Sequence, residues 1–253
     1  MNEFTSCTLK LENKCVSCVY FLHEKMYIFV IKVNFRGGSI MKKAILDAAK
    51  RNGDMLTTAQ AVRYGISKTM LAKYVEQNKL IRVRHGLYAL PDSIIDDVFA
   101  LYLQNPNIVF SHESALFLNG LAERTPFKQS VTVPSNRVLP KPVKEQCSCF
   151  YIRPTYFKLG LTRRKTTFGN DVPCYDAERT VCDIVRSRRR IDEETVVAAI
   201  KNYARSVQKD LFKLYEYSTT MSIYPTIKQY MEVWICRFFN SGFMNDHIHY
   251  RLS

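Results

Sequence analysis

Basic side chains gather in residues 57–90, at positions where they can meet nucleic acid. From Met41 to Leu90 the chain has ten Lys or Arg against three Asp or Glu, a net of +7 out of the whole chain's formal +14. Such a density favours polyanions through counterion release and predicts strongly salt-dependent binding. Six residues are the predicted DNA contacts: Lys68, Thr69, Lys73, Arg82, Arg84 and His85. The alternative is a merely solvated charged face.

The elements that must position these residues are two helices joined by a tight turn. Thr57 or Thr58 can cap a short helix that ends at Gly65, and Ser67 can cap a second helix. In the second helix, Leu71, Tyr74 and Val75 form an inward stripe. Lys68, Thr69 and Lys73 then face outward, where a recognition helix meets base edges and phosphates.

A hairpin follows, in which apolar and basic residues alternate along the first strand. Ile81 and Val83 fall on one face and Arg82 and Arg84 on the other, before the turn His85-Gly86 and a return strand over residues 87–90. An amphipathic helix from Met41 to Asn52, ended by Gly53, precedes all of this. The sequence therefore predicts a winged helix-turn-helix over residues 41–90.

The following residues, 91–234, are expected to form a mixed α+β domain with a helical C-terminus, so the fold class is α/β (α+β). A hinge at Pro91-Asp92-Ser93 would lead into a helix capped by Asp92 or Ser93. Apolar or alternating runs predict a small, mostly antiparallel sheet. Its strands are expected at Ser130 to Val133, Cys147 to Arg153, Thr166 to Phe168 and Val172 to Tyr175, and three helices follow Asp192.

Charged residues of the second domain have several interpretations. Asp176, Glu178, Arg179 and Asp183 can present carboxylates and a guanidinium near one edge of a helix, although an ion-pair network explains them equally well. Two arginine-rich runs, 163–165 and 186–190, are expected to form a second basic patch that touches DNA, binds RNA or is simply solvated. For His112 and Glu113, first-turn positions behind the cap Ser111 are favoured over general base catalysis.

Three stretches resemble a known family. The segment from Met41 to Ser67, with the following S-K-T-M-L-A-K-Y-V helix and H-G-L-Y-A-L wing, resembles the N-terminal domain of AbiEi-type antitoxins. These belong to abortive-infection systems, a form of phage defence. F-S-H-E-S-A-L-F-L-N-G-L at 110–121 and Y-D-A-E-R-T-V-C-D-I-V-R at 175–186 are similar to that family's second domain.

The resemblance implies an antitoxin of a type IV toxin-antitoxin system. Its winged helix would repress its own operon at an inverted-repeat operator, with two copies on adjacent half-sites. Its second domain would counter a nucleotidyltransferase-like toxin without a stable complex. The candidate residues for that activity are Asp176, Glu178, Arg179, Asp183 and Arg186. No metal or cofactor is expected.

Two other functions stay open. One is a stand-alone winged-helix regulator with a ligand-sensing second domain. The other is a nuclease fused to a winged helix, with metal ligands drawn from Asp171, Asp176, Glu178 and Asp183. A nuclease usually has a carboxylate-x-Lys strand beside its metal, and the sequence offers none that is convincing. The standard nucleotide-binding and hydrolase motifs are also missing from the sequence, which favours a binding protein over an enzyme.

The two ends of the chain fit the pattern poorly. Residues 1–40 are expected to be a leader with a short strand or no order, and residues 235–253 a tail. Arg36-Gly37-Gly38 can be encoded by a purine-rich ribosome-binding tract, which predicts that translation begins at Met41. Cys15, Cys18 and His23 are too few for a zinc site. With no signal peptide and too short an apolar run for a membrane span, the eight cysteines are expected to be reduced thiols in the cytoplasm.

Overall fold

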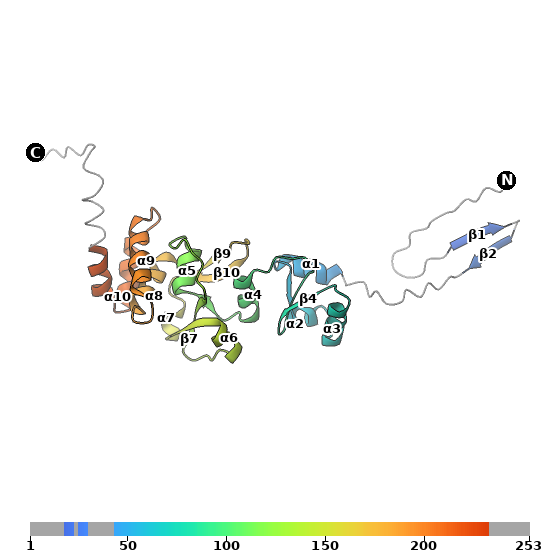
Figure 1. The fold of residues 1–253 in the computed structure, drawn as a ribbon, viewed down its shortest axis with the longest axis horizontal. Helices are drawn as coiled ribbons and strands as arrows, with labels where there is room; N and C mark the ends of the chain where they lie inside the picture. The colour runs from blue at the N-terminus through green and yellow to red at the C-terminus, as the bar shows by residue number, and fades with distance from the viewer. Residues whose placement is uncertain (1–17, 23–24, 30–42, 233–253) are drawn as a thin grey trace, which may run out of the picture. The chain divides into compact units, whose positions relative to one another are not determined.

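The computed structural model describes residues 18–22, 25–29 and 43–232, in two compact units that divide after Lys42 (Figure 1). In the first unit, β1 (Cys18–Leu22) and β2 (Lys25–Phe29) form an antiparallel pair. Cys15, His23, the proposed start at Met41 and residues 233–253 lie outside the described residues.

The second unit begins with the elements of a helix-turn-helix and a hairpin. They are α1 (Lys43–Arg51), β3 (Met55–Thr57), α2 (Thr58–Arg63), α3 (Lys68–Glu76), β4 (Ile81–Arg84) and β5 (Leu87–Ala89). The three strands form a sheet in the order β3-β5-β4, with antiparallel neighbours. The helices and the hairpin follow the sequence prediction, whereas β3 does not, because three residues are too few to show a period.

Local capping explains why the two helices of the turn start where they do. Thr57 and Gln60 form a capping box: the Thr57 hydroxyl accepts from the Gln60 amide at 3.2 Å, and Gln60 Oε1 accepts from the Thr57 amide at 2.9 Å. Ser67 Oγ accepts from the Met70 amide at 3.2 Å and starts α3. Gly65, at φ +75°, makes the turn between them.

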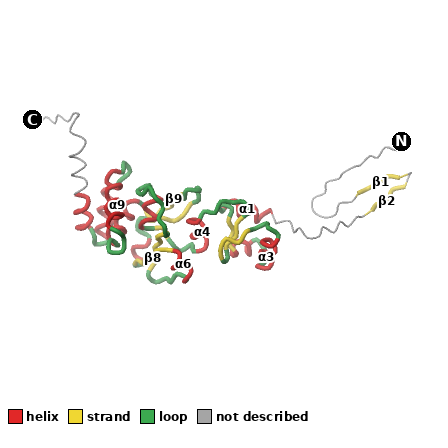
Figure 2. Tube along the Cα trace, viewed as in Figure 1, coloured by secondary structure: helices red, strands yellow, loops and turns green. Residues whose placement is uncertain are grey.

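The remaining elements build a mixed sheet covered by helices. They are α4 (Asp97–Gln104), β6 (Val109–Phe110), α5 (His112–Leu118), β7 (Gln129–Pro134), α6 (Lys141–Gln146), β8 (Cys147–Ile152), α7 (Pro154–Phe157), β9 (Leu161–Lys165), β10 (Asp171–Tyr175), α8 (Ala177–Arg186), α9 (Glu193–Arg205) and α10 (Leu211–Thr220). Residues 224–232 are also helical. Figure 2 shows helix and strand interleaved through this unit.

Three sequence predictions for this region are wrong. The sheet, ordered β8-β7-β6-β10-β9, is not mostly antiparallel, because β7 with β8 and β6 with β10 run parallel. Residues 166–168 form a turn after β9 rather than a strand, since Thr166 is buried to bond the Asp96 carboxylate. That carboxylate also caps α4 through the Phe99 amide, so the cap is Asp96 and not Asp92 or Ser93.

Two hydrophobic clusters hold the unit together. The first joins residues on both sides of position 90: Met55, Leu87 and Ala89 pack in the same cluster as Phe99 and Phe110. The second lies among α5, α8, α9 and α10. The helix-turn-helix part (residues 43–90) and the part after it (residues 91–232) thus share buried apolar surface, which opposes their separation.

Within the described residues, none of the helices has the length and apolar character needed to cross a membrane.

Candidate nucleic-acid interface

The outer face of α3 carries three of the six predicted DNA contacts. Lys68, Thr69 and Lys73 are all exposed, while Leu71 and Tyr74 on the opposite face are 0% and 1% exposed. Burial of those two side chains fixes the rotation of the helix, and the Ser67 cap fixes where it begins. The result is a short helix that presents two ammonium groups and a hydroxyl to solvent.

The hairpin presents two further predicted contacts, Arg82 and His85, both exposed. Arg84 has a different environment. Its guanidinium donates to Asp97 Oδ1 at 2.8 Å and to Gln146 Oε1 at 3.0 Å, so it joins the hairpin to α4 and α6. Gln104 Nε2 also donates to the carbonyl oxygen of His85 at 2.9 Å. The hairpin is therefore anchored on the part of the chain that follows residue 90.

A β-bulge explains why Arg84 departs from the expected alternation. Arg82 pairs with Tyr88, but Arg84 pairs with Leu87, so Val83 is an extra residue on β4. An extra residue bends a strand and turns the following side chain to a new direction. Arg82 and Arg84 therefore do not share a face, as the simple alternation predicts.

We expect the Arg84→Ala variant to loosen the hairpin with little direct loss of phosphate contact. Its ion pair with Asp97 is partly exposed, so chain stability should fall by no more than about 1 kcal/mol. DNA affinity should fall without a full unit of change in the salt slope. Fluorescence anisotropy on labelled DNA from the chain's own promoter, at several salt concentrations, measures both. A slope lowered by one unit would instead make Arg84 a phosphate contact.

The acidic candidates of the second domain are brought together, but they are buried. Asp176, Glu178, Arg179 and Asp183 are 9%, 4%, 0% and 3% exposed. Asp176 caps α8 by accepting from the Arg179 amide at 2.9 Å. Glu178 Oε1 accepts from the Tyr203 hydroxyl at 3.1 Å and from the Asp210 amide at 3.0 Å, which joins α8 to α9 and to the start of α10. Each of these groups bonds other parts of its own chain.

Arg179 is the centre of this network. Its Nε donates to Asp183 Oδ1 at 3.1 Å, and its Nη1 donates to the carbonyl oxygens of Tyr156 and Leu159 at 2.8 and 2.9 Å. The guanidinium also lies over the Tyr175 ring, 4.4 Å from its centroid. Among the described residues, Arg179 Nη2 and Asp183 Oδ2 are buried without a hydrogen-bond partner. The network fixes α8 against the chain before it.

Arg186 is the exception among the candidates, because it is exposed at the end of α8. The two arginine-rich runs do not meet in one patch, contrary to the sequence prediction. Residues 163–165 belong to β9, while Arg190 lies over the ring of Phe150 in β8 at 4.3 Å. These strands are the opposite edges of the five-stranded sheet.

His112 is buried in the first turn of α5, behind Ser111. Its ring stacks on Phe150 with centroids 3.5 Å apart, and its two nitrogens lie 2.9 Å from Ser111 Oγ and 3.0 Å from Ser187 Oγ. Burial, with the charges of Arg179, Arg190 and Arg186, lowers its pKa from 6.5 to about 3. The ring is therefore neutral at pH 7. Ser111 makes no capping bond to α5, because its hydroxyl accepts from Thr132 Oγ1 at 2.8 Å.

Among the side chains that the structure describes, Cys147, Cys149, Cys174 and Cys182 are free thiols. Burial raises the pKa of Cys147 to about 11 and that of Cys174 to about 12. Such thiols stay protonated at neutral pH and pack as small apolar groups. Among the residues the structure describes, no three His, Cys, Asp or Glu side chains are grouped closely enough to hold a metal ion.

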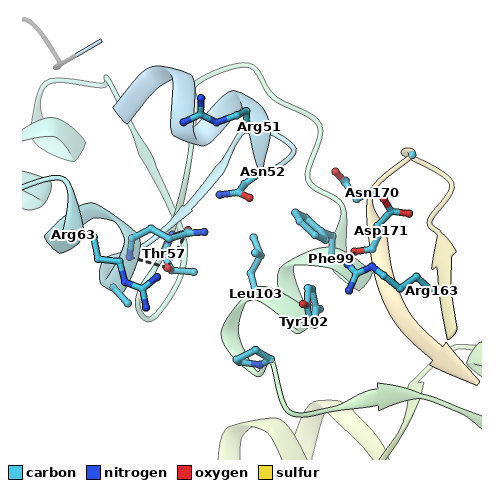
Figure 3. Close-up of a pocket in the computed structure, with 14 residues that line it drawn as sticks. Arg51, Asn52, Thr57, Arg63, Phe99, Tyr102, Leu103, Arg163, Asn170 and Asp171 are labelled. Carbon is cyan, nitrogen blue, oxygen red and sulfur yellow. Dashed lines mark hydrogen bonds between the residues drawn. The ribbon is translucent and has the colours of Figure 1, made fainter. Parts of the chain in front are cut away.

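The pattern of the sequence gives no sign of one further feature, a cleft of about 620 Å³ between the two parts of the second unit. Figure 3 shows Arg51, Asn52, Thr57 and Arg63 on one wall, with Phe99, Tyr102, Leu103, Arg163, Asn170 and Asp171 on the other. These residues come from distant segments and share no motif. Only the packing of α1 and α2 near α4, β9 and β10 brings them together.

Residues 43–91 match the family model described as "Transcriptional regulator, AbiEi antitoxin". This match confirms the resemblance to AbiEi-type antitoxins for the helix-turn-helix and hairpin. The motifs at 110–121 and 175–186 lie outside the matched range. The exposed face of α3 lies inside the matched range.

The fold of the chain is also found in a solved structure, the crystal structure of RV2827C protein from Mycobacterium tuberculosis. The TM-score is 0.50 at 13% sequence identity, over 76% of this chain and 80% of that chain. The likeness shows the fold and confirms the mixed α/β class. No curated protein matches the chain.

Proposed function

We propose that this chain is the antitoxin of a type IV toxin-antitoxin system, which binds operator DNA and represses its own operon. The observation that carries the proposal is the exposed basic face of α3, with Arg82 and His85 on the adjoining hairpin, inside the segment that matches antitoxin transcriptional regulators. An exposed helix of this kind can enter the major groove, while the hairpin reaches neighbouring phosphates. Two copies would occupy the half-sites of an inverted repeat in the cytoplasm.

The DNA contacts of this proposal are Lys68, Thr69, Lys73, Arg82 and His85, and Arg84 acts mainly by anchoring the hairpin. Lys68 and Thr69 lie in the first turn of α3, the part of a recognition helix that approaches base edges. Lys73 is exposed one turn further along α3 and is the proposed phosphate contact.

The part after residue 90 is proposed to counter a nucleotidyltransferase-like toxin encoded nearby, as a binding protein and not as an enzyme. Arg186 is its best placed candidate, because its side chain is exposed at the end of α8. Asp176, Glu178, Arg179 and Asp183 support that surface from within, through their hydrogen bonds to neighbouring elements. Neither a metal nor a cofactor enters this proposal.

The test is growth of cells that express the neighbouring gene, with and without the full chain. Removing residues 1–90 is a poor design, because Met55, Leu87 and Ala89 belong to the core that Phe99 and Phe110 share. The better comparison is a Lys68→Ala, Lys73→Ala double variant, which keeps the buried face of α3. Restored growth with both proteins, but promoter repression only with the wild type, supports two separable functions. A harmless neighbour would overturn the antitoxin proposal, leaving a winged-helix regulator.

The Lys73→Ala variant is expected to weaken binding to DNA from the chain's own promoter and to lower the salt slope by about one unit, because one phosphate contact is lost. Anisotropy titrations over a range of salt concentrations measure the slope. Lys158→Ala removes an equally exposed charge from the part after residue 90 and should leave the slope unchanged. If wild type and Lys73→Ala had the same salt slope, Lys73 would not be a phosphate contact.

A further inference from the structure

The cleft between α1–α2 and α4–β9–β10 has the size and the lining of a small-ligand site. Its volume of about 620 Å³ falls within the range of about 300–1,000 Å³ that is typical of such sites. Its charged lining residues are three arginines, Arg51, Arg63 and Arg163, and one acid, Asp171. Arginine from several elements around one concave space is suited to an anion, and above all to phosphate.

The wall formed after residue 90 adds an aromatic surface beside the charge. Tyr102 and Phe99 line the cleft, and the Arg163 guanidinium lies 5.8 Å from the centroid of the Tyr102 ring. Arg163 Nη2 donates to the backbone oxygen of Asp171 at 2.8 Å, which leaves its side chain exposed but held in place. Aromatic rings and guanidinium planes are the surfaces on which nucleobases stack.

The cleft is already formed in the free chain. The side-chain Nδ2 of Asn170 donates to Asp96 Oδ2 at 2.8 Å, and Asp96 also caps α4 and accepts from Thr166. A Cβ built on Gly53 would lie only 2.7 Å from Asn170 Oδ1, so the backbone after α1 touches this side chain directly. The hydrogen bonds fix the wall that follows residue 90, and the close approach of Gly53 to Asn170 is the cited contact between the two walls. A wall that is already fixed reduces the ordering cost of binding.

We propose that this cleft binds a nucleoside phosphate, with Arg51, Arg63 and Arg163 toward the phosphates and Tyr102 beside the base. Concave space of this volume admits a mononucleotide, whereas a DNA duplex reaches only the rim. One wall belongs to the helix-turn-helix part and the other to the part that follows, so a ligand that bridges them joins the DNA-binding half to the proposed antitoxin half. The site is separate from the exposed face of α3.

The test is isothermal titration calorimetry of the full chain with ATP, GTP, CTP and UTP. Adenosine and tripolyphosphate serve as probes for the base and the phosphates alone. We expect saturable binding of at least one nucleotide, at one site per chain, and weaker binding of both half-ligands. Arg163→Ala should weaken this binding about tenfold or more, as expected for a charge-assisted hydrogen bond. Tyr102→Leu should reduce the advantage of the nucleotide over tripolyphosphate.

Lys165→Ala is the matched control, because it removes an exposed charge from the same strand but does not line the cleft. Equal weakening by Arg163→Ala and Lys165→Ala would show non-specific attraction and overturn the proposal. So would the absence of saturable binding by all four nucleotides up to about 1 mM, or binding of tripolyphosphate as tight as that of the best nucleotide. Promoter DNA binding by Arg163→Ala without nucleotide should equal that of the wild type, which keeps this test distinct from that of operator binding.

Discussion

Replacing Arg179 with methionine is expected to lower the free energy of unfolding by about 3–5 kcal/mol, the usual cost of removing one partner from a buried ion pair. The Arg179 side chain is 0% exposed and the Asp183 side chain 4% exposed, so Asp183 would lose its cation where water cannot replace it. The carbonyl oxygens of Tyr156 and Leu159 would lose the Arg179 Nη1 donor as well, and of the two the Tyr156 oxygen keeps a bond from the Leu159 amide. Urea unfolding followed by circular dichroism measures the change.

Two variants make the Arg179 result specific. Arg186→Ala removes an exposed arginine from the same helix and should change stability by less than about 0.5 kcal/mol. Adding Asp183→Asn to Arg179→Met should recover part of the loss, because the unpaired carboxylate is then absent. If Arg179→Met costs no more than Arg186→Ala, the buried network does not stabilise the fold.

The four buried antitoxin candidates affect stability as well as any contact with a partner. Under the proposed antitoxin function, substitutions at Asp176, Glu178, Arg179 or Asp183 would reduce protection from the toxin by destabilising the fold, whether or not these residues contact a partner. Only Arg186, which is exposed, can be changed without disturbing buried hydrogen bonds. A growth assay therefore needs a measurement of protein stability beside every variant of α8.

The helix-turn-helix part could be predicted from the sequence because its signals are local. The Ser67 cap, the glycines at 53, 65 and 86 and the stripe through Leu71 and Tyr74 each lie within a few residues of the feature they determine. Capping, positive φ and helical periodicity act over one or two turns of chain. The structure has all of these features where the sequence predicts them.

The sheet after residue 90 could not be predicted in the same way, because its partners are distant in sequence. The parallel pairing of β6 with β10 joins Phe110 to Cys174, and no turn residue encodes that register. The cap of α4 was predicted at Asp92 or Ser93, where the local pattern is equally suitable. Asp96 takes the position instead, because its second oxygen bonds Thr166 and Asn170 from the β9–β10 turn.

In the candidate site, too, the features set by neighbouring residues could be predicted, whereas those set by distant contacts could not. Lys68, Thr69 and Lys73 face outward as helical periodicity requires, but Arg84 does not follow the strand period because of the bulge at Val83. Sequence spacing also suggested one basic patch from two arginine-rich runs, which the sheet order places on opposite edges. The cleft around Arg163 and Tyr102 has no sequence signal, since tertiary packing alone assembles it.

The motif at 110–121 has a structural explanation that involves backbone strain. His112 sits at φ +49°, a conformation that few residues other than glycine adopt. It is held there by stacking on Phe150 and by bonds to Ser111 and Ser187. A neutral imidazole has one donor and one acceptor nitrogen, and each can be matched by one of these hydroxyls.

Acid is expected to destabilise the chain through His112, and the His112→Asn variant should remove this effect. The folded pKa is about 3 against 6.5 for the free side chain, so the unfolded chain binds more protons between these values. The stabilisation is complete above pH 6.5 and is lost as the pH falls toward 3, by on the order of 5 kcal/mol in total. Asparagine tolerates positive φ and does not titrate, so it suits this position.

Urea unfolding of wild type and His112→Asn from about pH 7 to about pH 4 measures the difference in slope. Burial raises the pKa of Asp176, so its stabilisation is present below the unfolded pKa of 3.8 and is lost as the pH rises. That contribution has the opposite sign to the one from His112, but both proteins keep it. The difference between the two curves therefore reports His112 alone. If the two plots of unfolding free energy against pH were parallel, His112 would be protonated equally easily in the folded and the unfolded chain. The contacts of a neutral imidazole with Phe150 and Ser187 would then not stabilise the packing of α5 against α8.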